Sequence, residues 1–350
     1  ETSRRDVLPL SDWIPVHVVP YAAPWSRLQR LAPGLLDRFQ KVYCHTGAMR
    51  GMAGRAARAI AAAGCDVLFS ANCRYQGAPP IARDCALPSV FYCQEPFRAL
   101  HEPGIGSPLL THRRRRRREE IRNARAFDTV LVNSHYSRER IDTVYGIAAK
   151  TNYLGIDTDR FAPSGHPREE TLLGVGAIQP HKRIELAIAA CAALPAPRPR
   201  LTWIGNMVSA GYRRRLEQQA RAQHVDLELR QSVSDTDLRI ALSQARVFLY
   251  TSRREPFGLT PLEANACGTP VVAVREGGVV ETIRDGVNGY LCDPAPQALA
   301  DRLGALLAAP REAEAMGRRA RRHVRDHWSW SRSIDALEAA LEAATHRGRQ

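Results

Sequence analysis

One stretch in the second half of the chain indicates the fold most directly: Arg254-Glu255-Pro256-Phe257-Gly258-Leu259-Thr260-Pro261-Leu262-Glu263. The apolar run before it, residues 247–250, predicts a buried strand, and Phe257-Gly258 predicts a tight turn. Gly268-Thr269-Pro270 ends the helix that we expect next, and residues 270–274 predict another strand. The order strand, turn, helix, strand indicates one repeat of an α/β fold with a parallel sheet.

The start of that helix is predicted to be capped by its own side chains. We expect Thr260 at the cap, Pro261 at the first helical position and Glu263 at the third, which is a Thr-x-x-Glu capping box. A glycine turn that leads into a helix N-terminus also forms an anion site, because free N–H groups and the helix dipole face the loop. Local pattern alone leaves two roles open for Glu263, a plain capping residue or a ligand-binding one.

Composition describes a globular protein with anionic partners. The 350 residues are 44% hydrophobic and 25% charged, enough for two domains with separate cores. No apolar run reaches the roughly 18 residues that span a bilayer. Fifty basic against 36 acidic residues leave a net charge of +14, which favours nucleic acid, acidic lipid or a phosphorylated substrate. We expect a cytoplasmic location, with peripheral contact at the inner face of the membrane.

The eight cysteines are scattered and contain no Cys-x-x-Cys pair. This spacing favours small buried hydrophobic side chains in a reducing compartment over a disulfide framework or a zinc site.

The first half of the chain alternates between helical and strand patterns. Residues 14–20 predict a short strand and residues 25–64 are mostly helical. Strands are expected at 65–70, 87–93 and 127–134, with a helix that begins at Tyr136. Ligands of parallel sheets bind at the carboxyl ends of the strands. Residues 94–98 and Asn133-Ser134 are therefore predicted to border a cleft.

Arg113 to Arg118 form a run of six arginines. One interpretation is the solvated face of a helix whose arginines pair with nearby acids. The other is a patch for anionic lipid or a phosphate-bearing acceptor, which Arg binds bidentately. Without interleaved aromatic residues the run does not indicate nucleic acid.

The second half repeats the pattern of strand, turn and helix. A polar segment, residues 158–168, predicts the domain boundary. Strands are expected at 171–177, 201–206 and 227–229, and helices at 184–193, at 211–224, after Ser234, over 298–325 and at 334–344. Trp328 and Trp330 are predicted to anchor the last helix by packing.

The stretch around Glu255 resembles the Glu-x7-Glu motif of retaining family 4 glycosyltransferases (glycosyl transferases group 1). Tyr92-Cys93-Gln94-Glu95-Pro96-Phe97-Arg98 and Tyr153-Leu154-Gly155-Ile156-Asp157 are also similar to segments of that family. The resemblance implies the GT-B fold: two Rossmann-like parallel-sheet domains facing a cleft, with a C-terminal helix that crosses back. The expected domains are 1–162 for the acceptor, 163–327 for the nucleotide-sugar donor and 328–350 for the crossing helix.

The resemblance also implies the site. Glu255 would orient the sugar and Lys182 would neutralise the leaving diphosphate, and both are predicted catalytic residues. Predicted acceptor-binding residues are Gln94, Arg98, Asn133 and Ser134. The predicted donor-binding residues are Gly176, Arg183, Gly205, Asn206, Val233, Phe257, Gly258, Leu259, Thr260 and Glu263.

The implied reaction moves a mannose- or glucose-type sugar from a GDP- or UDP-linked donor to a glycan, lipid or small-molecule acceptor. It would retain the anomeric configuration and need no metal. Two Asp-x-Asp sequences, at 157–159 and 235–237, are assigned to the linker and to a helix cap and not to a metal site.

Three departures from the family keep other functions open. Gln94 stands where histidine is frequent and cannot shuttle a proton, and Ala177 stands where arginine is frequent. Residues 1–30 show no strand with a glycine-rich loop, so either the chain is truncated or that loop is absent. The alternatives are a catalytically impaired sugar-nucleotide-binding protein and an epimerase or phosphorylase of the same fold.

Overall fold

The computed structural model describes residues 49–73, 76–102, 110–206, 208 and 210–348. The chain divides into two compact units. The first runs up to Val130 and includes Val144–Ile147 and the chain from Leu341; the second comprises Leu131–Thr143 and Ala148–Ala340. These units do not test the predicted domain limits at 162/163 and 327/328, which stay a prediction. The strand predicted at 14–20, the helical segments before residue 49 and the glycine-rich loop sought in residues 1–30 lie outside the described residues.

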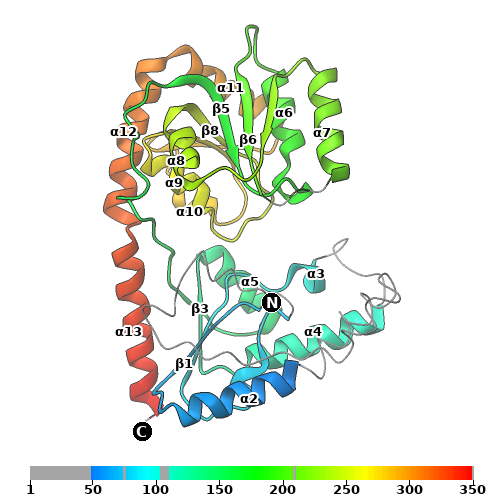
Figure 1. Cartoon of the computed structure of the whole chain (residues 1–350), viewed down its shortest axis with the longest axis vertical. Helices are drawn as coiled ribbons and strands as arrows, with labels where there is room; N and C mark the ends of the chain where they lie inside the picture. The colour runs from blue at the N-terminus through cyan, green and yellow to red at the C-terminus, as the bar shows by residue number, and fades with distance from the viewer. Residues whose placement is uncertain (1–48, 74–75, 103–109, 207, 209, 349–350) are drawn as a thin grey trace. The chain divides into compact units, whose positions relative to one another are not determined.

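The first sheet has four short strands in sequence order, and Figure 1 shows its position among the helices. They are β1 (Leu68–Ala71), β2 (Ser89–Tyr92), β3 (Thr129–Val132) and β4 (Lys150–Thr151). β1 pairs with β2 in parallel, as does β3 with β4. Every residue of β2 and β3 is buried, as expected of strands covered on both faces. The strands predicted at 65–70, 87–93 and 127–134 are confirmed with shorter bounds.

Helices and turns of the first half join these strands. The helix predicted at Tyr136 begins one residue earlier. The described elements are α2 (Met49–Ala62), the 3-10 helix η4 (Pro80–Arg83), α3 (Arg98–His101), α4 (Leu110–Ala124) and α5 (His135–Tyr145).

The arginine run lies on α4 and has two faces. Arg113 donates to the Leu100 carbonyl at 3.0 Å, and the Arg116 guanidinium lies 5.5 Å from the centre of the Phe97 ring. Burial lowers the pKa of Arg116, although the charge of Glu120 opposes this. The other four arginines of the run, Arg114, Arg115, Arg117 and Arg118, are exposed. The solvated-face interpretation therefore holds for these four and not for Arg113 and Arg116.

The second sheet contains six strands in the order β10-β9-β8-β5-β6-β7, and every neighbouring pair is parallel. The chain enters at β5, builds outward to β7, and then returns to the other side of β5 with β8. The order therefore reverses between β5 and β8, which is the switch point where open α/β sheets bind ligands. The strands are β5 (Glu169–Val175), β6 (Arg200–Ile204), β7 (Leu227–Arg230), β8 (Ala245–Tyr250), β9 (Val271–Val274) and β10 (Gly289–Cys292).

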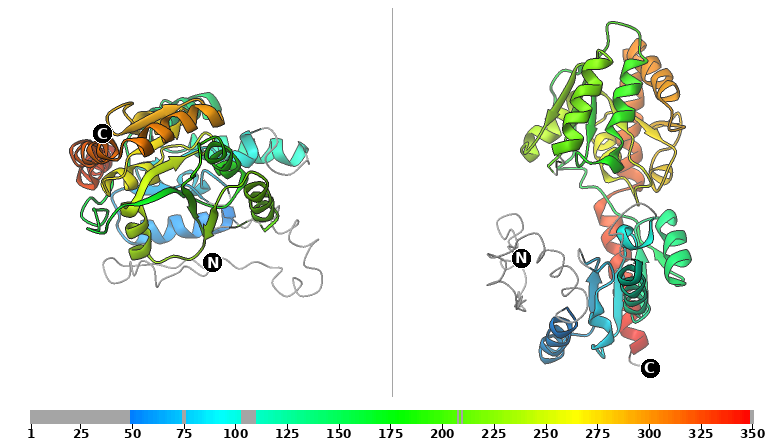
Figure 2. Two further views of the ribbon diagram at one scale, coloured as in Figure 1. Left: turned by 90° about the horizontal axis from the view of Figure 1, so that it is seen from above. Right: turned by 90° about the vertical axis from the view of Figure 1, so that its right-hand side faces the viewer.

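Helices pack on both faces of this sheet (Figure 1 and Figure 2). Leu172 and Leu173 are successive residues of β5 and enter different core clusters, because successive side chains of a strand point to opposite faces. The Leu172 cluster includes residues of α6, α7, α11 and α12, and the Leu173 cluster includes residues of α8, α9 and α10. These helices are α6 (Ile184–Ala192), α7 (Ala210–Ala222), α8 (Asp235–Gln244), α9 (Leu259–Ala266), α10 (Val279–Thr282), α11 (Pro296–Ala308) and α12 (Pro310–His327).

The last helix, α13 (Trp330–Gly348), has residues in both units, because the division falls between Ala340 and Leu341. This agrees with the predicted return of the C-terminal helix to the first domain, although the helix begins before the predicted residue 334. Trp328 is 8% exposed and its ring lies 5.6 Å from that of Phe257. The prediction of a packing anchor is wrong for Trp330, because its side chain is 55% exposed.

The described cysteines are all free thiols. Cys93, Cys191, Cys267 and Cys292 are buried, as predicted, whereas Cys65 is exposed just before β1. The prediction of a buried side chain is wrong for Cys65, because it lies in the turn between α2 and β1.

Candidate functional site

The switch point of the second sheet brings the two predicted catalytic residues together. Lys182 ends the 3-10 helix η5 (Pro180–Lys182) after β5, and Glu255 lies in the loop after β8. Lys182 Nζ donates to Glu255 Oε2 at 2.7 Å, and the two side chains are 12% and 28% exposed. The loops are also joined by the Thr251 side chain, whose Oγ1 donates to the Lys182 carbonyl at 2.8 Å, and by the Arg253 N–H, which donates to the His181 carbonyl at 2.8 Å. Sequence-distant loops therefore present a preformed pair of opposite charges.

Arg183 adjoins this pair and is held by protein groups. Its backbone is left-handed, with φ of 48°. Its guanidinium makes two bonds to the Glu276 carboxylate, at 3.1 and 3.0 Å, and one to the Thr251 carbonyl at 2.9 Å. Glu276 thus neutralises the cation that could have replaced an arginine at Ala177. The donor-binding role of Arg183 stays a prediction.

Two glycines set the backbone of Glu255. The Gly278 N–H donates to the Glu255 carbonyl at 2.9 Å. A Cβ atom at Gly277, where φ is 74°, would lie 2.3 Å from that carbonyl oxygen, and one at Gly278 would lie 2.1 Å from the Pro256 oxygen. Only glycine therefore allows the loops after β8 and β9 to pack backbone against backbone.

The predicted capping box at the start of α9 is wrong. The helix begins at Leu259, and the residue before it, Gly258, occupies the cap position with φ of 94° and no side-chain hydrogen bond. The left-handed glycine turns the chain into the helix two residues earlier than Thr260 could, so Thr260 and Pro261 fall inside the first turn. No side chain caps the free N–H groups of this turn, and they remain available to an anion.

Glu263 lies in the second turn of α9 and is mostly buried. Burial raises the pKa of its carboxyl group to about 7; Arg160 opposes the rise and Asp235 adds to it. Among the residues that the structure describes, no hydrogen bond or ion pair is recorded for this carboxylate. A largely desolvated carboxylate without a protein partner is suited to accept hydrogen bonds from ligand hydroxyls.

The remaining predicted donor residues lie at the ends of β5 and β6. Gly176 follows β5, and its N–H donates to the Ile204 carbonyl at 2.9 Å. A Cβ atom at Gly205 would lie 2.1 Å from the Gly176 oxygen, so these strand ends are in close contact. Asn206 accepts from the Ser232 N–H at 3.0 Å, next to Val233. Val233 itself lines a cavity of about 300 Å³ beside β5, β6 and α8.

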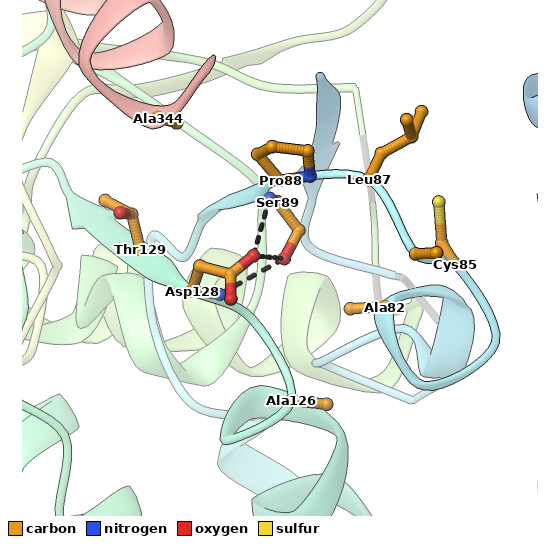
Figure 3. A pocket seen from close by; sticks show the side chains of 10 residues that line it. Ala82, Cys85, Leu87, Pro88, Ser89, Ala126, Asp128, Thr129 and Ala344 are labelled. Carbon is orange, nitrogen blue, oxygen red and sulfur yellow. Dashed lines mark hydrogen bonds between the residues drawn. The ribbon is translucent and has the colours of Figure 1, made fainter. Parts of the chain in front are cut away.

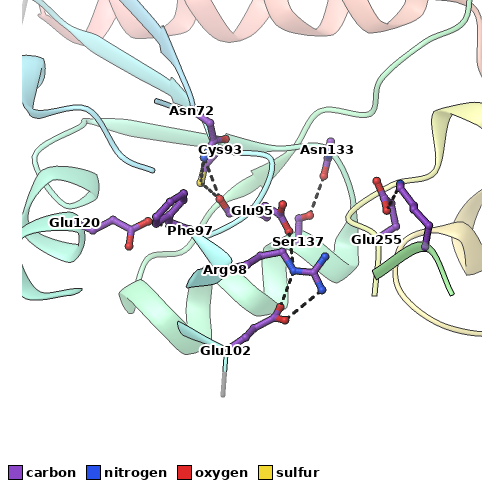
Figure 4. A network of polar contacts seen from close by, with 11 residues as sticks. Asn72, Cys93, Glu95, Phe97, Arg98, Glu102, Glu120, Asn133, Ser137 and Glu255 are labelled. Atoms are coloured by element: carbon purple, nitrogen blue, oxygen red, sulfur yellow. Dashed lines mark hydrogen bonds and ion pairs between the residues drawn. The ribbon is translucent and has the colours of Figure 1, made fainter. Parts of the chain in front are cut away.

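Two of the predicted acceptor residues, Gln94 and Arg98, lie in the first unit, on the segment after β2, and Figure 4 shows Arg98. The Gln94 N–H donates to Asn72 Oδ1 at 2.6 Å, and the side chain of Gln94 is exposed. Arg98 begins α3 and makes two bonds to Glu102, at 3.1 and 3.2 Å.

The other two, Asn133 and Ser134, are buried at the start of α5 in the second unit. Ser134 Oγ accepts from the Ser137 N–H at 2.9 Å, which caps the helix, and donates to the Pro256 carbonyl at 2.6 Å. Asn133 Oδ1 accepts from Ser137 Oγ at 2.8 Å. This geometry gives both residues a structural role beside the Glu255 loop, and their acceptor-binding role stays a prediction.

Glu281 is a residue of this region that the sequence patterns did not single out. Its carboxylate accepts from the N–H groups of His135 and Tyr136, at 2.8 and 2.9 Å, and from the Tyr153 hydroxyl at 2.9 Å. Its position three residues after Gly277-Gly278 was the only local signal for Glu281. Its partners Tyr136 and His135 are 145 and 146 residues away in sequence, so the local pattern does not indicate them.

A second cavity, of about 370 Å³, lies in the first unit and includes none of the predicted site residues (Figure 3). Its only carboxylate, Asp128, accepts from Ser89 N at 2.8 Å and Ser89 Oγ at 2.7 Å. The carboxylate is satisfied within the protein, so the cavity does not offer an obvious reactive group.

In the described ranges, no group of three or more His, Cys, Asp or Glu side chains is placed to hold a metal ion. The predicted metal independence stays a prediction. No helix in the described part of the chain is long and apolar enough to cross a bilayer.

The arrangement of strands and helices is that of GT-B glycosyltransferases. Sucrose-phosphate synthase from Thermosynechococcus elongatus superposes with a TM-score of 0.72 at 22% identity, over 85% of this chain and 79% of that one. An Anabaena protein, HepE, solved with UDP-glucose, superposes with a TM-score of 0.73 at 20% identity, over 97% and 88%. Residues 156–323 match the family "Glycosyl transferases group 1".

Curated relatives are similar over part of their length. A GDP-mannose-dependent alpha-(1-6)-phosphatidylinositol monomannoside mannosyltransferase from Mycolicibacterium smegmatis is 33% identical over 250 residues, which are 64% of each chain. A D-inositol 3-phosphate glycosyltransferase from Geodermatophilus obscurus is 37% identical over 244 residues, which are 62% of this chain and 53% of the relative. The match thus spans between about half and two thirds of these relatives.

Proposed function

We propose that the chain is a glycosyltransferase that moves a mannose- or glucose-type sugar from a nucleoside-diphosphate sugar to an acceptor hydroxyl, with retention at the anomeric carbon. The observation that carries this proposal is the 2.7 Å ion pair of Lys182 and Glu255, at the switch point of the second sheet and close in sequence to the uncapped start of α9. The match of residues 156–323 to the glycosyl transferases group 1 family and the GT-B fold support the same reaction class.

The donor is expected to separate the ion pair, with Lys182 binding its diphosphate and Glu255 binding its sugar. The diphosphate accepts from Lys182 and from the free N–H groups of the first turn of α9. Glu255 then turns to the sugar hydroxyls. Glu263 accepts from the ribose hydroxyls, and the backbone near Gly176, Gly205, Asn206 and Val233 borders the base.

Among the predicted site residues no side chain is a convincing nucleophile or general base, so we propose a mechanism without a covalent enzyme intermediate. The bond from the anomeric carbon to the phosphate oxygen breaks, and a bond to the acceptor oxygen forms on the same face. The acceptor proton passes to the departing phosphate oxygen. Lys182 stabilises the negative charge that develops on the diphosphate, and no metal ion is required in this scheme.

For the acceptor we propose a phosphate-bearing polyol or a lipid-linked sugar, bound through the segment that carries Gln94 and Arg98. The mycobacterial relative acts on a phosphatidylinositol monomannoside and the other relatives on inositol 3-phosphate, according to their names. The net charge of +14 suits anionic acceptors. The four exposed arginines of α4 are proposed to contact anionic lipid at the inner face of the membrane, from the cytoplasm.

The test combines donor binding with transfer. Calorimetry with GDP-mannose, UDP-glucose and UDP-N-acetylglucosamine identifies the donor, and release of the nucleoside diphosphate measures transfer and hydrolysis. Glu255→Ala is expected to reduce turnover by at least about 100-fold, as loss of a key electrostatic group does. Glu312→Ala is the control, because this glutamate forms an exposed ion pair with Arg319 on α12.

If the wild-type protein turns over none of these donors, the proposal that it is a glycosyltransferase is refuted. If nucleotides still bind in that case, the outcome favours the catalytically impaired binding protein. Full turnover by Glu255→Ala would refute the role of Glu255.

A further inference from the structure

The segment from Cys93 to Arg98 has little regular structure of its own and is held from one side by Asn72. This asparagine lies directly after β1. Its Oδ1 accepts from the Gln94 N–H at 2.6 Å, and its Nδ2 donates to the Glu95 carbonyl at 2.9 Å. One amide side chain therefore bonds to the backbones of two consecutive residues of the segment, as a neighbouring strand would. Figure 4 shows Asn72 beside Cys93 and Glu95.

From α4, the same segment is held by the carboxylate of Glu120. Glu120 Oε1 accepts from the Phe97 N–H at 2.9 Å and from the Tyr145 hydroxyl at 2.6 Å, and Oε2 lies 2.6 Å from His101 Nε2. The residue is 2% exposed. A carboxylate buried to this degree is stable only where such donors replace water.

The donors around Glu120 come from the two ends of α3 and from the end of α5. Phe97 precedes α3, His101 ends α3, and Tyr145 ends α5. Burial, together with the charge of Glu120, raises the pKa of Tyr145 far above its usual range, so the phenol remains a proton donor. The carboxylate thus joins both ends of the loop-and-helix element that carries Arg98 to the body of the first unit.

Glu120 and the segment that it holds are closely packed. A Cβ atom at Gly77, where φ is 70°, would lie 2.0 Å from Glu120 Oε1. The Arg116 guanidinium covers the Phe97 ring one turn before Glu120 on the same helix. Movement of the 93–98 segment therefore requires that the bonds of Glu120 break.

We propose that Glu120 and Asn72 are positioning residues for the acceptor, which hold Gln94 and Arg98 in the geometry that binds it. This inference rests on the proposed function, because the acceptor role of Gln94 and Arg98 belongs to it. Neither Glu120 nor Asn72 touches the substrate; each acts through the segment that it holds.

The test compares Glu120→Gln and Asn72→Ala with Tyr145→Phe. Tyr145→Phe removes one hydrogen bond from the same carboxylate and one from the Cys93 thiol, but none from residues 94–98, so it controls for general loss of stability. Glu120→Gln replaces one acceptor oxygen by an NH₂ group that opposes the surrounding donors. Asn72→Ala removes the two hydrogen bonds to Gln94 and Glu95 without changing a buried charge. This variant keeps the test valid if Glu120→Gln does not fold.

Two readouts are measured on the full chain. Hydrogen exchange of the amides of residues 94–98 is expected to accelerate by about 10-fold or more in Glu120→Gln and Asn72→Ala, and to change less than 2-fold in Tyr145→Phe. With GDP-mannose as donor and inositol 3-phosphate as acceptor, the acceptor KM is expected to rise about 10-fold in the first two variants. The affinity for GDP-mannose alone should not change.

The outcomes separate the two proposals. Unchanged exchange and unchanged acceptor KM in both variants, in an active enzyme, would overturn the positioning role and leave the proposed function intact. Wild-type protein that neither binds a nucleotide sugar nor transfers from one would overturn the proposed function, and with it the acceptor role. Equal effects of Tyr145→Phe on exchange and KM would show that the residues only stabilise the unit, which also refutes positioning.

Discussion

Replacing Glu263 by Gln is expected to stabilise the protein at pH 8 and to leave its stability nearly unchanged near pH 4.5. In the unfolded chain this carboxyl loses its proton near its ordinary pKa of 4.5, whereas burial raises the pKa in the folded protein to about 7. Between these two values the folded state binds more protons than the unfolded state. The free energy of unfolding of the wild type therefore falls as the pH rises through this window, and it levels off above about pH 7.

The magnitude follows from the size of the shift. One pKa unit corresponds to about 1.4 kcal/mol, so a rise from 4.5 to about 7 destabilises the ionised form by at most ~3.5 kcal/mol. Solvent still reaches part of the side chain, so we expect the ionised carboxylate to destabilise the folded protein by roughly 2 kcal/mol. Gln has nearly the same shape and does not titrate, so its difference from the wild type isolates this contribution.

The assay is unfolding in urea at pH 5, 6, 7 and 8, for the wild type and Glu263→Gln. Native-state hydrogen exchange of the β9 amides reports the second unit separately, because the two units need not unfold together. Glu312→Gln, on the exposed surface of α12, is the control and should show no such pH dependence. An advantage of the Gln variant that is equal at pH 5 and pH 8 would refute the reasoning, as would a wild type that is the more stable protein at pH 8.

Three further substitutions test the second unit. Gly278→Ala should destabilise it by roughly 1–3 kcal/mol in thermal unfolding, because the added methyl group meets the Pro256 carbonyl; an unchanged melting temperature would contradict this contact. Ser234→Ala should cost about 1 kcal/mol by the same measurement, because it removes the cap on the Asp237 N–H, and it should leave nucleotide binding unchanged. Lys182→Ala should weaken nucleoside-diphosphate binding about 10-fold or more in calorimetry, through loss of a charge-assisted bond; equal affinity would exclude contact with the diphosphate.

The alternating strands and helices were predictable because each depends on local pattern. Residues 247–250 and 270–274 are continuous apolar runs, and a strand buried on both faces requires such runs. Lys182 and Glu255 were predicted as a pair through the family resemblance, and the structure places both in loops that follow strands of the second sheet. The strand order, however, cannot be read from any single segment, and it is the strand order that places β5 beside β8.

The errors and omissions have a common physical origin in contacts between distant residues. Thr260 carries the right side chain for a cap, but Gly258 turns the chain earlier because its loop packs against Gly278. Arg183 reads as a free cation until Glu276, 93 residues later, is seen to neutralise it. By sequence, Glu120 continues an arginine-rich surface helix, although it is the most enclosed carboxylate among the described residues of its unit. Local periodicity contains no information about such partners.

The ion pair of Lys182 and Glu255 has a consequence for product release. While the site is empty, each charge satisfies the other, so small anions such as sulfate must separate the pair and leave a partly desolvated carboxylate without a donor. An intact nucleotide sugar avoids that penalty, because it brings phosphate oxygens for the lysine and hydroxyl donors for the glutamate in one molecule. After transfer, the nucleoside diphosphate keeps the phosphate oxygens that bind Lys182 but no longer carries the sugar hydroxyls that bind Glu255. In the proposed reaction, re-formation of the Lys182–Glu255 pair would then compete with the bound nucleoside diphosphate and favour its release.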